Sequence, residues 1–344
     1  MGRALWLLGR GFSPREIFLW GLLDPRVAWG DLRRYVSKER FLDFQARISP
    51  PSHAVLLEDK GTFHALCDQF DIPTPEAFAF LCDQGVWTVQ RDFCDGVAGL
   101  VRVIGQMGDT EFVLKPCDGV YGRDIRAITL QEGALYSDGV RVSPAELLRS
   151  LTPGTQYVLE RRVHNHPDIE SITGVRTLQA LRVVTVLSER ATGRATIASA
   201  SWRVVASETI ADNFDYGAGG NMRAGLDPET GEIVRVIRAA PSGFGTEEVV
   251  DHPRTGVPLL GRRMPSWPEV RDLLERKAAC FRPIRLVGWD IAITDDGPVF
   301  LEGNFWFDPG DNAFGTVAEF MERVETDQFA PTTDVRPHRA WARG

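Results

Sequence analysis

Three oxygen-bearing side chains gather at one expected hairpin, residues 286–304. Asp290 lies inside its first, apolar half, and Glu302 and Asn304 end its second half. The Thr-Asp-Asp-Gly between the halves is typical of a hairpin turn, and pairing would bring the three side chains together. Hard oxygen ligands at one place suit Mg²⁺. Exposed strand charges are the simpler alternative, but Asp290 has apolar neighbours, where a lone carboxylate needs a metal or a base beside it.

A second group of residues could bind phosphate. The strand expected at 111–115 ends in Lys115 and leads into a loop that contains Gly119 and Gly122. Glycine frees backbone N–H groups to line a phosphate, and lysine adds a point charge. A plain turn with a surface lysine is the alternative. The order GxxxxGK[ST] is absent and no GxGxxG follows a first strand, which excludes a P-loop and argues against a dinucleotide-binding fold.

The elements that must position these residues fall into four stretches. Ser13 and Pro14 are typical of a helix start, and helical spacing dominates up to Phe70. Prolines 73 and 75 favour an extended link, after which short strands and helices alternate. We therefore expect a mainly helical region at 1–72, a lid-sized α+β subdomain at 73–157, a larger α+β subdomain at 158–327 and a flexible tail at 328–344.

Four short motifs in this order resemble those of the ATP-grasp enzymes, most closely their sugar-transfer-associated branch. They are Glu58-Asp59-Lys60 before Asp71-Ile72-Pro73-Thr74-Pro75, Val113-Leu114-Lys115-Pro116, Tyr157-Val158-Leu159-Glu160, and Gly288-Trp289-Asp290 with Leu301-Glu302-Gly303-Asn304. Two further stretches, 212–221 and 252–256, resemble that branch in particular. The resemblance covers nearly the whole chain. It implies an α+β ATP-grasp fold, with the nucleotide held between two α+β subdomains and a mainly helical region before them.

The resemblance also implies ATP and Mg²⁺ as cofactors and a role for each motif. The phosphates would be held by Lys60 and Lys115 under a lid loop with Gly119 and Gly122, adenine by Glu160 and the backbone near Val163, ribose by Asp168 or Glu170, and magnesium by Asp290, Glu302 and Asn304. Magnesium bound there would draw charge from the transferring phosphoryl group.

One departure from related peptide-forming ligases concerns an arginine. Those enzymes commonly place it two residues before the metal aspartate, where this sequence has Gly288. In those enzymes the arginine stabilises the tetrahedral intermediate. Arg182 is our first candidate for this role and Arg203 the second, because each lies in an apolar strand where an arginine needs an anionic partner. A structural salt bridge is the alternative for both.

Substrate contacts are expected from several loops. Asn213 and Asn221 flank a glycine-rich segment that could shape itself around a substrate or only turn. His252 stands in a Pro- and Gly-rich loop, where it is a substrate contact, a general base or an exposed loop residue. Arg123 and Arg203 complete the expected substrate set.

Composition excludes other classes of function. The net charge of −8 supplies no broad basic field for nucleic acid or an anionic membrane, and no apolar run is long enough for a membrane span. The five cysteines lack zinc or redox spacing. His164, His166 and Asp168 lack a fourth zinc ligand nearby, and no histidine is placed to activate Cys117. We expect a cytoplasmic protein whose partners are small molecules.

The resemblance implies an ADP-forming carboxylate–amine ligase. It would activate a carboxylate as an acyl phosphate and transfer it to an amine or similar nucleophile, in specialised-metabolite or saccharide biosynthesis. A kinase that acts on a small alcohol or sugar would use the same magnesium ligands and stays open as an alternative. An inactive nucleotide-binding regulator is the third possibility, although all three magnesium ligands are present.

Overall fold

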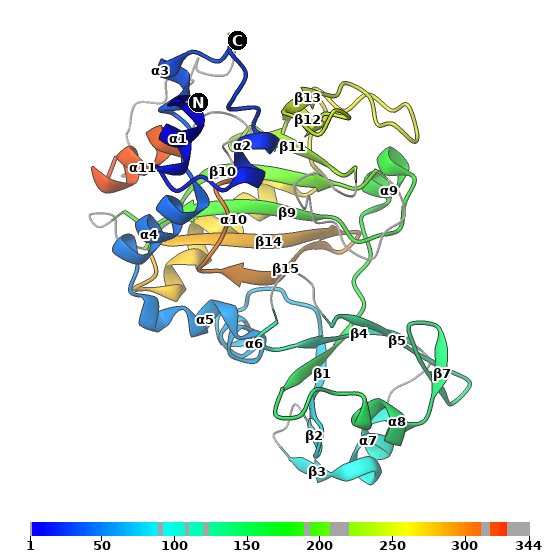
Figure 1. Ribbon diagram of the computed structural model, residues 1–344. Coiled ribbons are helices and arrows are strands. Elements are labelled where there is room, and N and C mark those ends of the chain that lie inside the picture. The colour runs from blue at the N-terminus through cyan, green and yellow to red at the C-terminus, as the bar shows by residue number, and fades with distance from the viewer. Residues whose placement is uncertain are drawn as a thin grey trace.

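The chain forms an N-terminal helical region and two subdomains, each built on one antiparallel sheet (Figure 1). The computed structural model describes residues 2–88, 92–106, 110–119, 124–188, 193–206, 220–310 and 317–328. The N-terminal elements are α1 (Gly2–Leu8), α2 (Pro14–Leu19), α3 (Trp29–Leu32), α4 (Lys38–Ile48), the 3₁₀ helix η1 (Pro51–His53), α5 (Val55–Glu58) and α6 (Lys60–Gln69). At the start of α2, Ser13 and Glu16 form a reciprocal capping box, and Pro14 occupies the first turn as expected.

The first sheet belongs to the smaller subdomain, at the bottom of Figure 1. Its strand order is β3-β2-β1-β8-β4-β5-β6-β7. The strands are β1 (Ala77–Cys82), β2 (Gly85–Thr88), β3 (Phe93–Asp95), β4 (Thr110–Pro116), β5 (Arg126–Gln131), β6 (Ala134–Ser137), β7 (Val140–Val142) and β8 (Tyr157–Arg161), with helices α7 (Gly96–Ile104) and α8 (Pro144–Arg149).

The expected boundary at residue 157 is wrong because it would cut β8 from this sheet. Strand β8 pairs with β1 on one side and with β4 on the other. The smaller subdomain therefore extends to Arg161, and the connection to the second sheet runs through α9 (Pro167–Thr173).

The second sheet has the order β13-β12-β11-β10-β9-β14-β15. Its strands are β9 (Ala180–Val186), β10 (Thr196–Val204), β11 (Met222–Leu226), β12 (Ile233–Ala239), β13 (Thr246–Glu248), β14 (Leu286–Thr294) and β15 (Gly297–Asn304), and its helices are α10 (Trp267–Lys277), the 3₁₀ helix η3 (Ala278–Phe281) and α11 (Val317–Glu325). Strands β14 and β15 form the expected hairpin, and Gly297 takes the positive φ of +108° that its turn requires.

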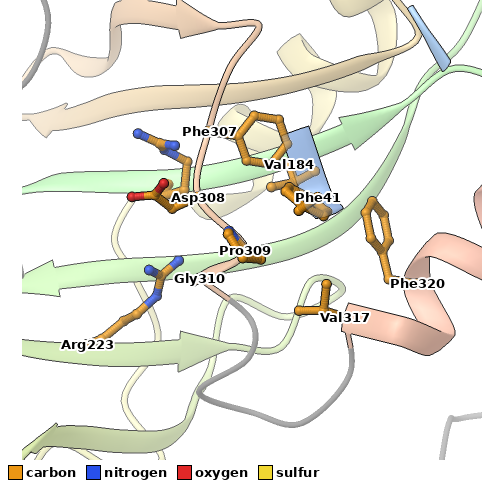
Figure 2. A pocket seen from close by; sticks show the side chains of 10 residues that line it. Phe41, Val184, Arg223, Phe307, Asp308, Pro309, Gly310, Val317 and Phe320 are labelled. Atoms are coloured by element: carbon orange, nitrogen blue, oxygen red, sulfur yellow. The ribbon is translucent and has the colours of Figure 1, made fainter. Parts of the chain in front are cut away.

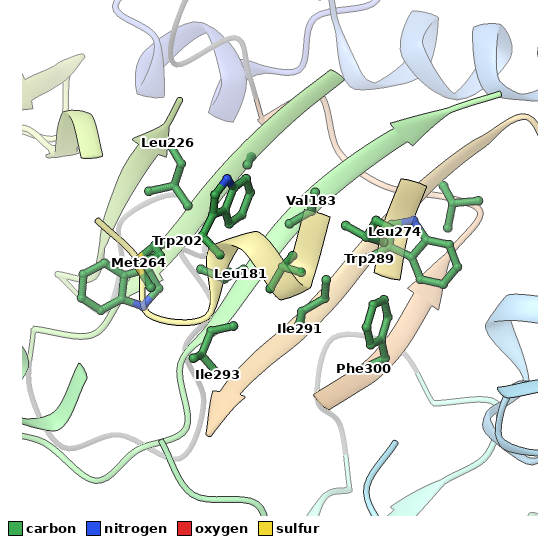
Figure 3. Close-up of a cluster of buried hydrophobic side chains, with 14 of the residues drawn as sticks. Leu181, Val183, Trp202, Leu226, Met264, Leu274, Trp289, Ile291, Ile293 and Phe300 are labelled. Atoms are coloured by element: carbon green, nitrogen blue, oxygen red, sulfur yellow. The ribbon is translucent and has the colours of Figure 1, made fainter. Parts of the chain in front are cut away.

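Alternation along the strands gives the two faces of this sheet different roles. Leu181, Trp289 and Ile291 face α10 in a buried apolar cluster (Figure 3). Val184 on the other face packs in the cluster that α4 and α11 share. Because side chains alternate, Arg182 and Asp290 must lie on this second face. The second sheet thus packs apolar side chains against α10 on one face and carries charged side chains on the other.

Helices α5 and α6 join the two subdomains at the edge of the second sheet. A Cβ added at Gly303 of β15 would approach Leu57 of α5 to 2.6 Å and Phe63 of α6 to 3.2 Å, so glycine permits this close packing. The backbone N–H of Phe300 donates to the carbonyl of Pro73 over 2.8 Å, which ties the start of the smaller subdomain to the same edge. Among the described residues, no helix combines the length and apolarity that a membrane crossing requires.

Candidate active site

Asp290 is the centre of a buried charge cluster on the second sheet. It lies opposite Glu302 of β15 on one side and opposite Arg182 of β9 on the other. Arg182 donates from Nε to Oδ1 over 2.5 Å and from Nη2 to Oδ2 over 3.1 Å, and Arg203 of β10 donates from Nη2 to Oδ2 over 2.8 Å. The sequence predicted that Asp290 needs a positively charged partner. That partner is a pair of guanidinium groups, which the adjacent strands β9 and β10 contribute.

The two carboxyl groups of this cluster differ in acidity. Burial alone would raise the pKa of Asp290, but the charges of Arg182 and Arg203 outweigh it and lower that pKa well below its ordinary value. The pKa of Glu302 is raised, first by burial and then by the negative charge of Asp290. Asp290 is therefore the stronger acid of the pair and Glu302 the weaker one.

Gly288 explains how Arg182 reaches this place. A Cβ at residue 288 would meet the ring of Phe307 at 2.9 Å and Nη1 of Arg182 at 3.4 Å. A side chain on β14 would thus compete with Arg182, which arrives from the neighbouring strand and lies near the Phe307 ring, with its guanidinium 5.9 Å from the ring centroid. The structure places both candidate arginines, Arg182 and Arg203, beside Asp290.

Lys60 connects this cluster to the smaller subdomain. Its ammonium donates to the carbonyl of Gly119 over 2.9 Å and lies 3.7 Å from Glu302 Oε2. Its backbone N–H donates to the carbonyl of Cys117 over 2.8 Å. The first residue of α6 thus bonds both to the start of the glycine loop and to a carboxylate of the second sheet.

Lys115 belongs to a second buried cluster, on the first sheet. Its ammonium pairs with Glu160 Oε2 at 2.8 Å, and the other oxygen of Glu160 lies 2.6 Å from Nε2 of His64. Burial would raise the pKa of Glu160, but Lys115 and then His64 lower it. His64 was not predicted from the sequence, because its partner lies 96 residues away and its position in α6 shows no distinguishing pattern.

A narrow pocket opens beside the Asp290 cluster (Figure 2). Its walls are Phe41, Val184, Phe307, Val317 and Phe320, and Arg182, Arg223, Asp308, Pro309 and Gly310 complete its lining. Arg223 of β11 lies directly opposite Arg203 and packs against Gly310, where any Cβ would fall within about 2.3 Å of its guanidinium. Sequence reasoning missed Arg223, although a strand arginine two residues after Asn221 was a signal of the same kind as Arg182.

The model of the sugar-transfer associated ATP-grasp family matches residues 39–309, well over half of the chain. The chain belongs to this ATP-grasp family. Its fold is the α+β ATP-grasp fold with a helical N-terminal region, as the sequence predicted. Membership supports ATP binding and ATP-dependent ligation as the general class of activity.

Several solved structures resemble this one over most of the chain. The ATP-grasp ligase PsnB, solved with a precursor variant, Mg and ADP, is 13% identical with a TM-score of 0.42, over 81% of this chain and 61% of that chain. N5-carboxyaminoimidazole synthase from Aspergillus clavatus is 10% identical with a TM-score of 0.44, over 86% and 59%. D-alanyl-alanine synthetase A from Vibrio cholerae is 14% identical with a TM-score of 0.43, over 82% and 68%. The chain spans less than two thirds of the first two proteins. No curated protein matches it.

The donor set of the ATP-grasp site fits magnesium. Asp290 and Glu302 supply carboxylate oxygens, and Asn304 donates from Nδ2 to the carbonyl of Gly288 over 3.0 Å, which leaves its amide oxygen as a possible ligand. In the described part of the chain, no group of three or more His, Cys, Asp or Glu could hold a metal. Magnesium commonly uses one or two carboxylates together with substrate phosphates, so two carboxylates and an amide suffice.

The remaining predicted residues have different outcomes. Val163 and Asp168 follow β8 on the connection between the sheets, and Asp168 is exposed, so adenine and ribose binding there stay predictions. Asn221 is buried and accepts a hydrogen bond from the backbone of Ala206 over 3.2 Å. Gly122, Arg123 and Asn213 lie outside the described residues.

The expectation of an accessible histidine at 252 is wrong. His252 is 0% exposed, and its Nε2 lies 3.0 Å from the carbonyl of Val205, which follows β10. Burial lowers its pKa, so the imidazole stays neutral. His252 therefore supports a loop rather than meeting a substrate.

Proposed function

We propose that this protein is an ATP- and magnesium-dependent ligase that releases ADP and phosphate. A carboxylate oxygen of the substrate acid attacks the γ-phosphorus of ATP, which forms an acyl phosphate and releases ADP. An amine then attacks the acyl carbon, loses a proton, and displaces phosphate to leave an amide. The partners are a small-molecule acid and an amine or similar nucleophile, in specialised-metabolite or saccharide biosynthesis.

The observation that carries the proposal is the pair of arginines beside the acid pair. Arg182 and Arg203 both contact Asp290, whose other neighbour in the sheet is Glu302. The two guanidinium groups hold Asp290 through three hydrogen bonds, two from Arg182 and one from Arg203. Donors held in a buried site stabilise negative charge that develops on an oxygen, typically by a factor of about 10²–10³ in rate. An acyl phosphate and its tetrahedral adduct both develop such charge.

The nucleotide would lie between Lys60, Lys115 and the glycine loop on one side and the acid pair on the other. Magnesium bound with ATP would supply neutralising charge at the phosphoryl group. Lys115 lies close enough to Glu302 to lower its pKa, and Lys60 contacts it at 3.7 Å, so both ammonium groups face the carboxylate that would carry the metal. Closure of the smaller subdomain over this space would exclude water, which hydrolyses an acyl phosphate.

The pocket of Figure 2 has a volume of about 10 Å³, room for one water molecule, so the acid would enter it only if its walls move apart. Its aromatic and aliphatic walls suit an apolar portion of the acid, and Arg182 and Arg223 at its edge suit the carboxylate.

The cysteines bear on the cellular location of the protein. The five cysteines, none of them in a disulfide, agree with a reducing compartment, and we propose a cytoplasmic enzyme.

Product analysis with a panel of carboxylic acids tests the proposal. Wild type and Glu302→Gln are incubated with ATP and Mg²⁺, with and without hydroxylamine as a surrogate nucleophile. The proposal predicts ADP and a hydroxamate that wild type forms and Glu302→Gln does not. AMP with pyrophosphate would contradict it, and ADP with a phosphorylated alcohol would establish the kinase alternative.

A further inference from the structure

The first three helices form a unit that lies outside the family match. The family model begins at residue 39, after α1, α2 and α3. These helices have a small apolar cluster of their own, formed by Leu7, Phe12, Ile17, Leu22 and Leu32. Because the ATP-grasp core starts later, this unit is free to carry a function separate from the reaction.

This region reverses the charge of the chain. Residues 1–50 contain nine Lys and Arg and five Asp and Glu, a net charge of +4, whereas the whole chain with 39 and 47 has −8. The other 294 residues therefore carry −12. The overall charge excluded a broad basic field, but it concealed this local one.

Three of these arginines gather at one place. Arg10 is partly buried, and its pKa is lowered first by that burial and then by the positive charges of Arg40 and Arg33. In the described part of the chain, none of the three has an ion pair within 4.0 Å, whereas Arg34, Lys38 and Arg47 nearby pair with carboxylates. Mutual repulsion of this kind is relieved by an anionic partner.

An aromatic and apolar band borders the arginines. The guanidinium of Arg10 lies 4.7 Å from the ring centroid of Trp6, and Trp6 meets Trp29 edge to face at 5.4 Å. Leu5 and Leu8 are three residues apart on one side of α1, next to Trp6, and are 65% and 48% exposed. Trp29 is 50% exposed. The exposed leucines therefore belong to the same short helix as Trp6, which Arg10 and Trp29 contact.

We propose that this surface, the N-terminal patch formed by Leu5, Leu8, Trp29, Arg10, Arg33 and Arg40, docks the protein onto an anionic lipid bilayer. Tryptophan and leucine enter the boundary between headgroups and acyl chains, and arginine extends to lipid phosphates. Cationic residues beside an anionic leaflet each contribute about fivefold in affinity. The proposal is independent of the ligase reaction.

A lipid surface fits the patch better than a nucleic acid. The phosphate backbone of a nucleic acid binds arginine and lysine, but it makes no favourable contact with the two exposed leucines of α1. The alternation of apolar and basic groups over one short surface matches a leaflet, which presents both chemistries in layers. An acidic protein surface is the other occupant that the test must separate.

Co-sedimentation of the full chain with vesicles tests the proposal. Vesicles of phosphatidylcholine alone are compared with vesicles that contain 30% phosphatidylglycerol (mole fraction of the test mixture, about one anionic lipid in three). We expect binding only to the anionic vesicles, weakened by raised salt. Arg10→Glu with Arg33→Glu should lower the partition coefficient by about 25-fold or more, and Leu5→Glu with Leu8→Glu by about tenfold.

A matched control separates the patch from general surface effects. Val140→Glu changes an equally exposed apolar residue (65%) on β7 of the smaller subdomain and should bind like wild type. Circular dichroism melting verifies that each variant is folded. Absence of binding by wild type, equal binding to neutral vesicles, or unchanged binding by both patch variants would overturn the proposal, and an acidic partner protein would then be the occupant to seek.

Discussion

Among the described residues, Glu160 and Asp290 are buried carboxylates that are each held by two side chains, and they differ in what surrounds them. Glu160 on the first sheet has one lysine and one histidine as partners. Asp290 on the second sheet has two arginines and a second carboxyl group, Glu302, in contact. The first cluster is closed, because each oxygen of Glu160 has its donor and, in the segments that the structure describes, no second carboxyl group is paired with it. The second is open in the sense that it combines two cationic groups with a second carboxyl group, Glu302, whose pKa is raised.

The difference indicates which cluster serves chemistry and which serves position. A closed cluster fixes Lys115 relative to the sheet and gains nothing from a ligand. An open cluster can exchange a proton on Glu302 for a metal and direct guanidinium donors at a substrate oxygen. We therefore propose that the second sheet stabilises charge and that the first positions the nucleotide.

Neutralising each carboxylate in turn is the strongest test of whether the two clusters have different roles. Asp290→Asn leaves two guanidinium groups together without their anion and should reduce turnover by at least about 10³-fold and the free energy of unfolding by about 3 kcal/mol. Glu160→Gln leaves only Lys115 without its anion, so it should reduce both the turnover and the free energy of unfolding by less. Steady-state kinetics and urea denaturation of the two variants measure this order, and the reverse order would show that the assignment of roles is wrong.

Shortening the arginine tests the open cluster without removing its charge. Arg182→Lys cannot reproduce the two-point contact with Asp290, so kcat should fall about 10²-fold while the KM for ATP changes little. Arg161→Lys is the matched control, since Arg161 makes an exposed pair with Glu76 on the first sheet. An unchanged kcat in Arg182→Lys would reduce Arg182 to a structural salt bridge.

His64 tests the closed cluster. His64→Leu leaves one oxygen of buried Glu160 without a donor, which should lower the free energy of unfolding by about 1–3 kcal/mol and raise the dissociation constant for ADP through Lys115. His64→Gln keeps an N–H donor and should restore most of the ADP affinity. Calorimetric titration with ADP and Mg²⁺ measures this constant, and equal affinity in both variants and wild type would exclude a positioning role.

The smallest expected effect is a change in pH dependence at Glu302. Its folded pKa lies above the ordinary 4.5, so the stability that the protonated form contributes is present below about pH 4.5 and is lost as pH rises through the folded pKa. Glu302→Gln should flatten this decline in the metal-free protein. Thermal unfolding in chelator, at pH values from below 4.5 upwards, measures the slope. A slope that is unchanged in the variant would assign the decline to another group.

The parts of the site that were predicted are those in which local pattern decides. The hairpin of Asp290 and Glu302 follows from strand alternation and its turn, and Arg182 follows from a charge inside an apolar strand. His64 and Arg223 were missed because their roles depend on contacts that no local spacing reveals. His252 was misplaced because a Pro- and Gly-rich loop resembles surface, yet a carbonyl 47 residues away holds the ring inside. The boundary at 157 failed for the same reason, since β8 is placed by its pairing with β1 and β4.

The central claim is that the Asp290 cluster activates a carboxylate as an acyl phosphate. Once the hydroxamate assay names the acid, that acid is prepared with ¹⁸O in its carboxylate and turned over with ATP and an amine, and the released phosphate is analysed by mass spectrometry. The account predicts one ¹⁸O atom in each phosphate, because the carboxylate oxygen that attacked phosphorus leaves with it. Phosphate without the label, formed together with the amide, would contradict the account.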